Sequence, residues 1–172
     1  MRLQLWVFII KQRSIVDNYL LLKLVHILSA VVITGTGAGI AFFMFMTSRT
    51  SNIAAIAVTA RLVILADWLF TAPAVAIQFI TGILLMLKLG YSFHSLWFLW
   101  VISLFIFIGT CWVPVVYIQY KLRKLANVSL SNGVLEPSFN KLMRLWTALG
   151  IPAFISILII FWLMVFKPLP LL

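Results

Sequence analysis

The sequence predicts an all-α, polytopic membrane protein, a bundle of four transmembrane helices. Hydrophobic residues make up 65% of its 172 residues and charged residues 9%, whereas a soluble domain has about 25% charged residues. Four apolar blocks each reach the roughly 20 helical residues that cross about 30 Å of hydrocarbon. These blocks are residues 19–46, 62–87, 96–120 and 145–166. They lack the alternation of barrel strands, so helices must satisfy the backbone in lipid.

The chain reads as a single membrane domain with two short tails. No linker rich in Gly, Ser or Pro separates a second unit. We expect the membrane domain to cover residues 19–167 and a tail to follow at 168–172. Residues 1–18 contain an apolar run that is too short to span a bilayer. Two interpretations of this segment stay open: it lies at the membrane interface, or it is an extension from an upstream start codon.

The net charge of +10 is distributed unevenly along the chain and predicts an orientation in the membrane. The connections after the first and third helices carry these basic residues: Arg49, Arg61, Lys121, Arg123, Lys124, Lys141 and Arg144. The opposite side carries Arg2, Lys11, Arg13, Lys88 and Lys167. The positive-inside rule then places the two basic connections in the cytoplasm and both termini outside. The lipid bilayer, and not a nucleic acid, is the predicted partner of these charges.

The first helix, 19–46, carries an ionisable pair and a run of small residues. Lys23 and His26 are three residues apart and share a face. The run from Thr34 to Gly39 leaves the middle of the helix almost without side chains, and small faces let helices approach closely in lipid. We therefore expect His26 to point into the bundle. Three interpretations of it stay open: a packing histidine bonded to a neighbouring helix, a haem or metal ligand, or a proton-handling group.

The second helix, 62–87, carries a polar and small stripe that we expect to face the interior. Its members recur at spacings of four, three, four and four: Asp67, Thr71, Ala74, Gln78 and Gly82. A carboxylate inside a membrane costs roughly 2.5–3.5 kcal/mol at the helix centre, so Asp67 should have a partner. Arg144 is the candidate that matches its depth best. Asp67 is then either half of a buried ion pair or a functional carboxylate.

The third helix, 96–120, begins beside His94, and Pro114 is expected to kink it. His94 should lie at the outer membrane edge on the same side as His26, where two imidazoles suit one haem iron. Met44 and Met46 do not share a helical face, so they predict no metal site. We expect residues 121–144 to form a basic loop along the lipid headgroups before the fourth helix, 145–166.

Several spaced segments together resemble the bacterial "predicted integral membrane protein" family known as domain of unknown function family 2269. The segments are Tyr19 to His26, Ala66 to Pro73, Gln78 to Gly82, Cys111 to Pro114 with Gln119, Trp146 to Gly150, and Phe161 to Pro168. The resemblance implies no established activity. A fainter likeness, through Lys23 and His26, reaches the copper-resistance D membrane domain and the four-helix protoporphyrinogen oxidase. That likeness implies copper handling or haem-linked redox chemistry.

Two functions from different classes follow from these observations. One is a small haem-b-binding redox or electron-transfer protein, with His26 and His94 as iron ligands. In it Lys23, Asp67 and Gln78 would be polar or proton-handling groups, and Thr71 and Arg144 are further polar residues within the membrane. The other is a non-enzymatic membrane accessory subunit or transport-associated protein without a cofactor, which associates with membrane protein partners or with itself. Hydrolase chemistry finds no support, because the chain has neither a metal-protease nor a phosphate-loop motif.

Overall fold

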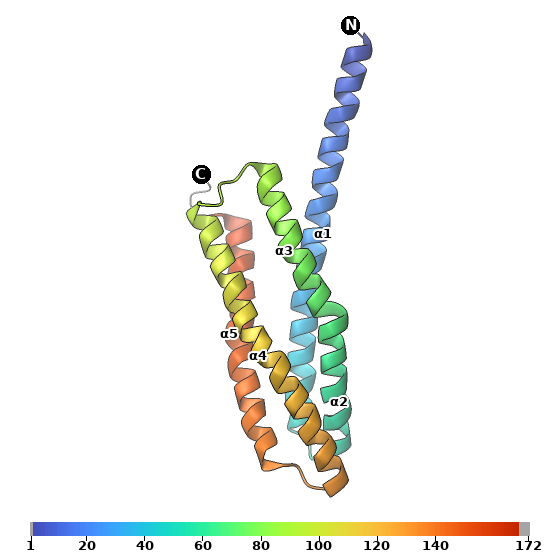
Figure 1. Ribbon diagram of the computed structural model, residues 1–172, viewed down its shortest axis with the longest axis vertical. Coiled ribbons are helices and arrows are strands. Elements are labelled where there is room, and N and C mark those ends of the chain that lie inside the picture. The colour runs from blue at the N-terminus through green and yellow to red at the C-terminus, as the bar shows by residue number, and fades with distance from the viewer. Residues whose placement is uncertain (1, 169–172) are drawn as a thin grey trace.

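The computed structural model describes the backbone of residues 2–168 and the side chains of residues 17–168. Within that range the chain is helical and contains no strand (Figure 1). The elements are α1 (Arg2–Ser48), α2 (Ile53–Ala66), the π-helix η1 (Asp67–Thr71), α3 (Ala72–Leu89), α4 (Leu96–Asn132) and α5 (Pro137–Phe166). Four spans in this range are long and apolar enough to cross a membrane: Asp17–Ser48, Ile53–Leu89, Leu96–Asn132 and Pro137–Phe166. The predicted all-α, four-helix membrane fold is confirmed.

The helices run beyond the apolar blocks at the end of the bundle where the basic connections lie. Most of the segment expected to be a loop, 121–144, is helix, and only residues 133–136 connect α4 to α5. Lysine, arginine and leucine are good helix formers, and the buried Leu122, Ala126 and Phe139 pack in the core there. Gly133 ends α4 with a φ of 74°, a left-handed conformation that glycine adopts without strain.

At its amino-terminal side α1 is a single helix that continues past the end of the bundle (Figure 1). The segment 1–18, apart from Met1, is therefore described as part of this helix and not as a separate element. Of the described side chains, the first is Asp17, so the interfacial interpretation of the tail concerns side chains outside the described residues.

The second span bends at η1 and changes its packing partner there. Its first part, α2, packs on α4 and α1, whereas its last part, α3, packs on α1 (Figure 1). The N–H of Ala72 bonds to the carbonyl of Asp67, five residues back, which is the π-helical pattern. Pro73 follows at once; it has no N–H, and its ring would clash with a carbonyl in a regular α-helix. The extra residue of the π-turn relieves that crowding and lets α3 lean towards α1.

Two apolar cores close the two ends of the bundle. The larger core lies beside the basic connections and includes Met44, Ile56, Leu122 and Phe139, all almost fully buried. The smaller core, at the other end, joins α3, α4 and α5 through Met86, Trp97 and Leu163. Between them α3 and α4 meet through large side chains, as where Phe79 stacks on Phe105 at 5.9 Å between ring centroids. The polar side chains of the candidate site lie between these two cores.

Candidate functional site

His26 lies between α1 and α3, with each ring nitrogen in a hydrogen bond to α3. Its Nδ1 is 2.8 Å from Thr81 Oγ1, and its Nε2 is 3.0 Å from Gln78 Nε2. Because an amide nitrogen only donates, this arrangement makes Nε2 the acceptor and Nδ1–H the donor to Thr81. The Thr81 hydroxyl in turn donates to the carbonyl of Ile77 at 2.6 Å. The imidazole is therefore fully bonded inside the bundle.

Ser29 and Gly82 complete this arrangement, which we call the His26 cluster: His26, Ser29, Gln78, Thr81 and Gly82. Ser29 is buried, and its single hydroxyl hydrogen is shared between Gln78 Oε1 and the carbonyl of His26, both within hydrogen-bond distance. A Cβ built on Gly82 would lie 3.3 Å from His26 Cε1, so glycine here lets the ring approach the backbone of α3. The cluster thus joins α1 to α3. Small residues such as Ser29 and Gly82 let the two helices approach closely, as is common between helices in membranes.

Lys23 and His94, two other residues of the haem hypothesis that the structure describes, make no bond to this cluster. Lys23 lies one turn before His26, and its side chain is exposed. His94 lies in the connection between α3 and α4, where it is exposed and its backbone N–H bonds to Ser92 Oγ at 3.1 Å. Seven residues of α3, about 10 Å of helix rise, separate Gly82 from the end of that helix. The structure describes no contact that joins the two histidines.

A second set of polar groups lies at η1, where a hydrogen bond joins Asp67 to Gln119 of α4. Asp67 is 5% exposed, and its Oδ2 accepts a hydrogen bond of 2.7 Å from Gln119 Nε2. Thr71 follows one turn along η1 and is 6% exposed. Trp146 of α5 is buried in the same core as Ile118, the neighbour of Gln119. Asp67, Thr71, Gln119 and Trp146 are called the Asp67 cluster below.

Hydrogen-bond partners are incomplete in the Asp67 cluster. Four buried polar atoms of the described residues have no partner: Thr71 Oγ1, Gln119 Oε1, Trp112 Nε1 and Trp146 Nε1. Three of them belong to the cluster, and Trp112 lies two turns from Gln119 on the same face of α4. Most buried polar atoms in proteins have a partner, so orphans that gather in one place need an explanation.

Arg144, which the sequence suggested as the partner of Asp67, does not take that role. Its side chain is exposed near the start of α5, and the structure pairs Asp67 with Gln119 instead. The expectation rested on estimated depth in the membrane. Depth gives the level of a side chain but not its direction around the helix, and α4, which carries Gln119, is the helix that packs against α2.

Four site residues were not singled out for a site role from the sequence: Ser29, Thr81, Gln119 and Trp146. Ser29 lies three residues after His26, and Thr81 lies three residues after Gln78. Each therefore shares a helix face with a residue that the sequence did single out. Gln119 lies eight residues after Cys111 on the buried face of α4. The polar stripe from Asp67 to Gly82 was found from spacing, and its members are buried or half-buried.

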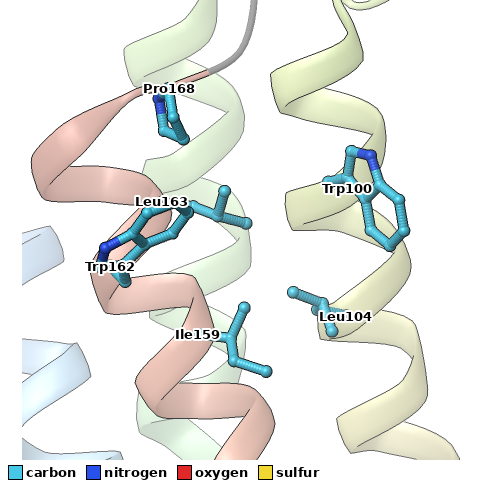
Figure 2. A pocket seen from close by; sticks show the side chains of 6 residues that line it. All are labelled: Trp100, Leu104, Ile159, Trp162, Leu163 and Pro168. Carbon is cyan, nitrogen blue, oxygen red and sulfur yellow. The ribbon is translucent and has the colours of Figure 1, made fainter.

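An apolar groove of about 420 Å³ lies between α4 and α5 near the smaller core (Figure 2). Figure 2 shows Trp100 and Leu104 on α4 across the groove from Ile159 on α5. Its lining is Trp100, Leu104, Ile159, Trp162, Leu163 and Pro168. Binding sites usually add a few well-placed polar groups to an apolar wall. This lining offers only indole nitrogens, and its two tryptophans are about half exposed on the surface that faces lipid.

Among the described residues, no group of three or more His, Cys, Asp or Glu side chains has the arrangement of a metal site. Comparison with known proteins gives one match: a family model described as "Predicted integral membrane protein (DUF2269)" covers residues 20–168. No curated protein and no solved structure matches the chain. The comparisons therefore support the first resemblance drawn from the sequence and give no support to the two fainter ones.

Proposed function

The chain belongs to the DUF2269 family of predicted integral membrane proteins, and from that premise we propose that it acts as a non-enzymatic accessory subunit or transport-associated protein. Its membrane-spanning helices pack against each other and against a partner in the bilayer, and this role requires no haem. The single observation that carries this proposal is the complete bonding of His26. A histidine whose two nitrogens hold neighbouring side chains serves the packing of helices.

A haem-iron ligand must present a free imidazole nitrogen to the metal, usually with the other nitrogen held by a hydrogen bond. His26 uses its second nitrogen on Gln78, and its ring lies against Gly82. His94 is exposed in a connection between helices. These residues do not fit a bis-histidine haem, so no step of the proposed function passes through one.

An absorbance spectrum tests this proposal directly. The protein is purified in mild detergent from haem-sufficient cells and measured oxidised and reduced, before and after haem is added. We expect no Soret or alpha band that depends on His26, as judged against the His26→Ala variant. A reduced-state band that wild type shows and His26→Ala loses would overturn the proposal and establish the haem-binding function.

Association in the membrane is the second part of this proposal. Native mass spectrometry of the gently solubilised protein should find it in a stoichiometric complex with itself or with another membrane polypeptide. A strictly monomeric protein at every detergent concentration would contradict the role of a subunit. Native mass spectrometry and the haem absorbance spectrum are independent measurements. Either part of the proposal can therefore be disproved without the other.

The orientation follows from the positions of the basic residues. The connections at 49–52 and 133–136 lie at the same end of the bundle (Figure 1), and the basic residues near them favour the cytoplasmic side of a bacterial inner membrane. Cysteines placed at the exposed Ser51 and Asn132 should resist a membrane-impermeant thiol reagent in intact cells, as the buried native Cys111 should. Labelling of either position from outside would reverse the orientation.

A further inference from the structure

We propose that the Asp67 cluster binds one small alkali-metal cation within the membrane domain, with Asp67, Thr71 and Gln119 as its oxygen ligands. This inference goes beyond the accessory function and does not depend on it. It rests on the charge that is buried at Asp67 and on the oxygen atoms beside it that have no partner.

The first argument concerns the charge of Asp67. The side chain is 5% exposed, and its recorded partner is a neutral amide, Gln119. The basic residues that approach this level of the bundle from the cytoplasmic end, Arg61, Lys141 and Arg144, are all exposed. A buried carboxylate without a cationic partner is costly in lipid. A bound cation supplies the missing positive charge.

The second argument concerns the ligands. Gln119 Oε1 and Thr71 Oγ1 are buried oxygens without a hydrogen-bond partner, on residues that are 3% and 6% exposed. Gln119 is fixed beside Asp67 by the 2.7 Å bond, and Thr71 lies one turn further along η1. One carboxylate and two neutral oxygens make a hard-oxygen set. That set suits a hard cation, and its single negative charge balances a monovalent one.

The third argument concerns the indole nitrogen of Trp146. Its Nε1 is a buried donor without an acceptor among the described residues. A water molecule bound to the cation has a second lone pair and can accept such a bond. A hydrated cation in the cluster therefore accounts for the orphan oxygen atoms of Thr71 and Gln119 and supplies an acceptor for Trp146 Nε1.

Thermal unfolding in detergent tests the proposal. The melting temperature of the protein is measured in sodium, lithium, potassium and choline chlorides at constant ionic strength. We expect at least one alkali cation to raise the melting temperature by about 4 °C or more, in a saturable way, because a ligand that binds only the folded state stabilises it. Choline, which is too large for the cluster, should give no such rise.

Two variants and a matched control make the test specific. Asp67→Asn removes the charge, and Thr71→Val removes one oxygen ligand with little change in shape. Thr34→Val is the control, because Thr34 Oγ1 is already bonded to the carbonyl of Ala30 on α1. The cation-dependent rise should vanish in Asp67→Asn, fall in Thr71→Val and persist in Thr34→Val. If Asp67→Asn does not fold, Thr71→Val decides the question alone.

Three results would overturn the proposal. Equal melting temperatures in all four salts, at every concentration tested, would show that no alkali cation binds. A rise of equal size in choline chloride, relative to buffer without added salt, would reflect a general salt effect and not a bound alkali cation. A rise that Thr71→Val and Thr34→Val both retain would place the cation elsewhere. The outcome of the haem absorbance measurement does not affect the interpretation of these melting temperatures. The cation proposal and the proposed function can therefore be disproved separately.

Discussion

The His26 cluster and the Asp67 cluster each join the same bent span to other helices, and they differ in how completely their hydrogen bonds are made. In the first, both imidazole nitrogens and the amide of Gln78 have partners. In the second, one bond holds Asp67 to Gln119, and polar atoms on three neighbouring side chains have none. An ionisable residue within the membrane is therefore not by itself a functional site. A packing role and a binding role differ in whether the buried polar atoms around the residue already have hydrogen-bond partners.

The two clusters also explain how the span is held in its bend. Gln119 fastens η1 to α4, whereas Gln78 and Thr81 fasten α3 to α1. The π-turn before Pro73 lies between these attachments. π-turns inside helices are frequent at functional sites. Asp67 is the first residue of η1, so the bend and the Asp67 cluster share a residue.

The largest effect should come from His26→Ala. This change removes two hydrogen bonds between helices and leaves a void against α3, so we expect it to lower the free energy of unfolding by about 2 kcal/mol. The exposed neighbour Lys23→Ala is the control and should change it by less than about 0.5 kcal/mol. Unfolding by sodium dodecyl sulfate in mixed micelles measures both. An equally small loss in His26→Ala would show that the cluster does not stabilise the bundle.

The pairing of Asp67 with Gln119 should appear as a coupling energy. In a double-mutant cycle of Asp67→Asn and Gln119→Leu, measured in choline chloride, we expect the losses to be non-additive by about 1 kcal/mol. The same cycle with Arg144→Gln should be additive, because the side chain of Arg144 is exposed and Asp67 bonds to Gln119 instead. Coupling to Arg144 and none to Gln119 would restore the ion pair that the sequence suggested.

The fold was predictable because lipid imposes it. A segment of about 20 apolar residues with few charges crosses a bilayer as a helix. The spacing of the stripe from Asp67 to Gly82 predicted which face of the second span is buried. The ends of the helices were less predictable. Residues 121–132 are polar, and hydropathy reads them as a loop, but their helix propensity and the burial of Leu122 and Ala126 continue α4.

The partners within the site were not predictable from one sequence. Spacing assigned Asp67 and His26 to interior faces, but the identity of the facing residue depends on which helix packs there and how it is rotated. The switch of the second span from α4 to α1 at η1 decides that Asp67 meets Gln119 and that His26 meets Gln78. Pro73 was visible in the sequence, yet the π-turn that it accompanies is a property of the packed bundle.

Close approach at Gly82 should be measurable against a glycine that lacks it. Gly82→Ala places a Cβ 3.3 Å from His26 Cε1, so the ring must shift, and we expect a loss of about 0.5–1 kcal/mol of unfolding free energy despite the better helix propensity of alanine. Gly37→Ala, with nothing within 4 Å of its Cβ, should be neutral or stabilising. The same unfolding assay compares them, and equal effects would mean that Gly82 does not control the approach of α1 to α3.

The smallest effect should come from a bond on the outside of the bundle. Trp68 Nε1 donates to Tyr120 OH at 2.9 Å, and both side chains are largely exposed. Hydrogen bonds between membrane helices average about 0.6 kcal/mol, and this one closes no interior void, so Tyr120→Phe should lower the unfolding free energy by no more than about that amount. Tyr117→Phe, three residues earlier on the exposed surface, is the control, because it keeps the ring that lies under Lys121. If Tyr120→Phe instead cost as much as His26→Ala, the surface bond would hold the bend of the span and the contrast between the two interior clusters would no longer explain it.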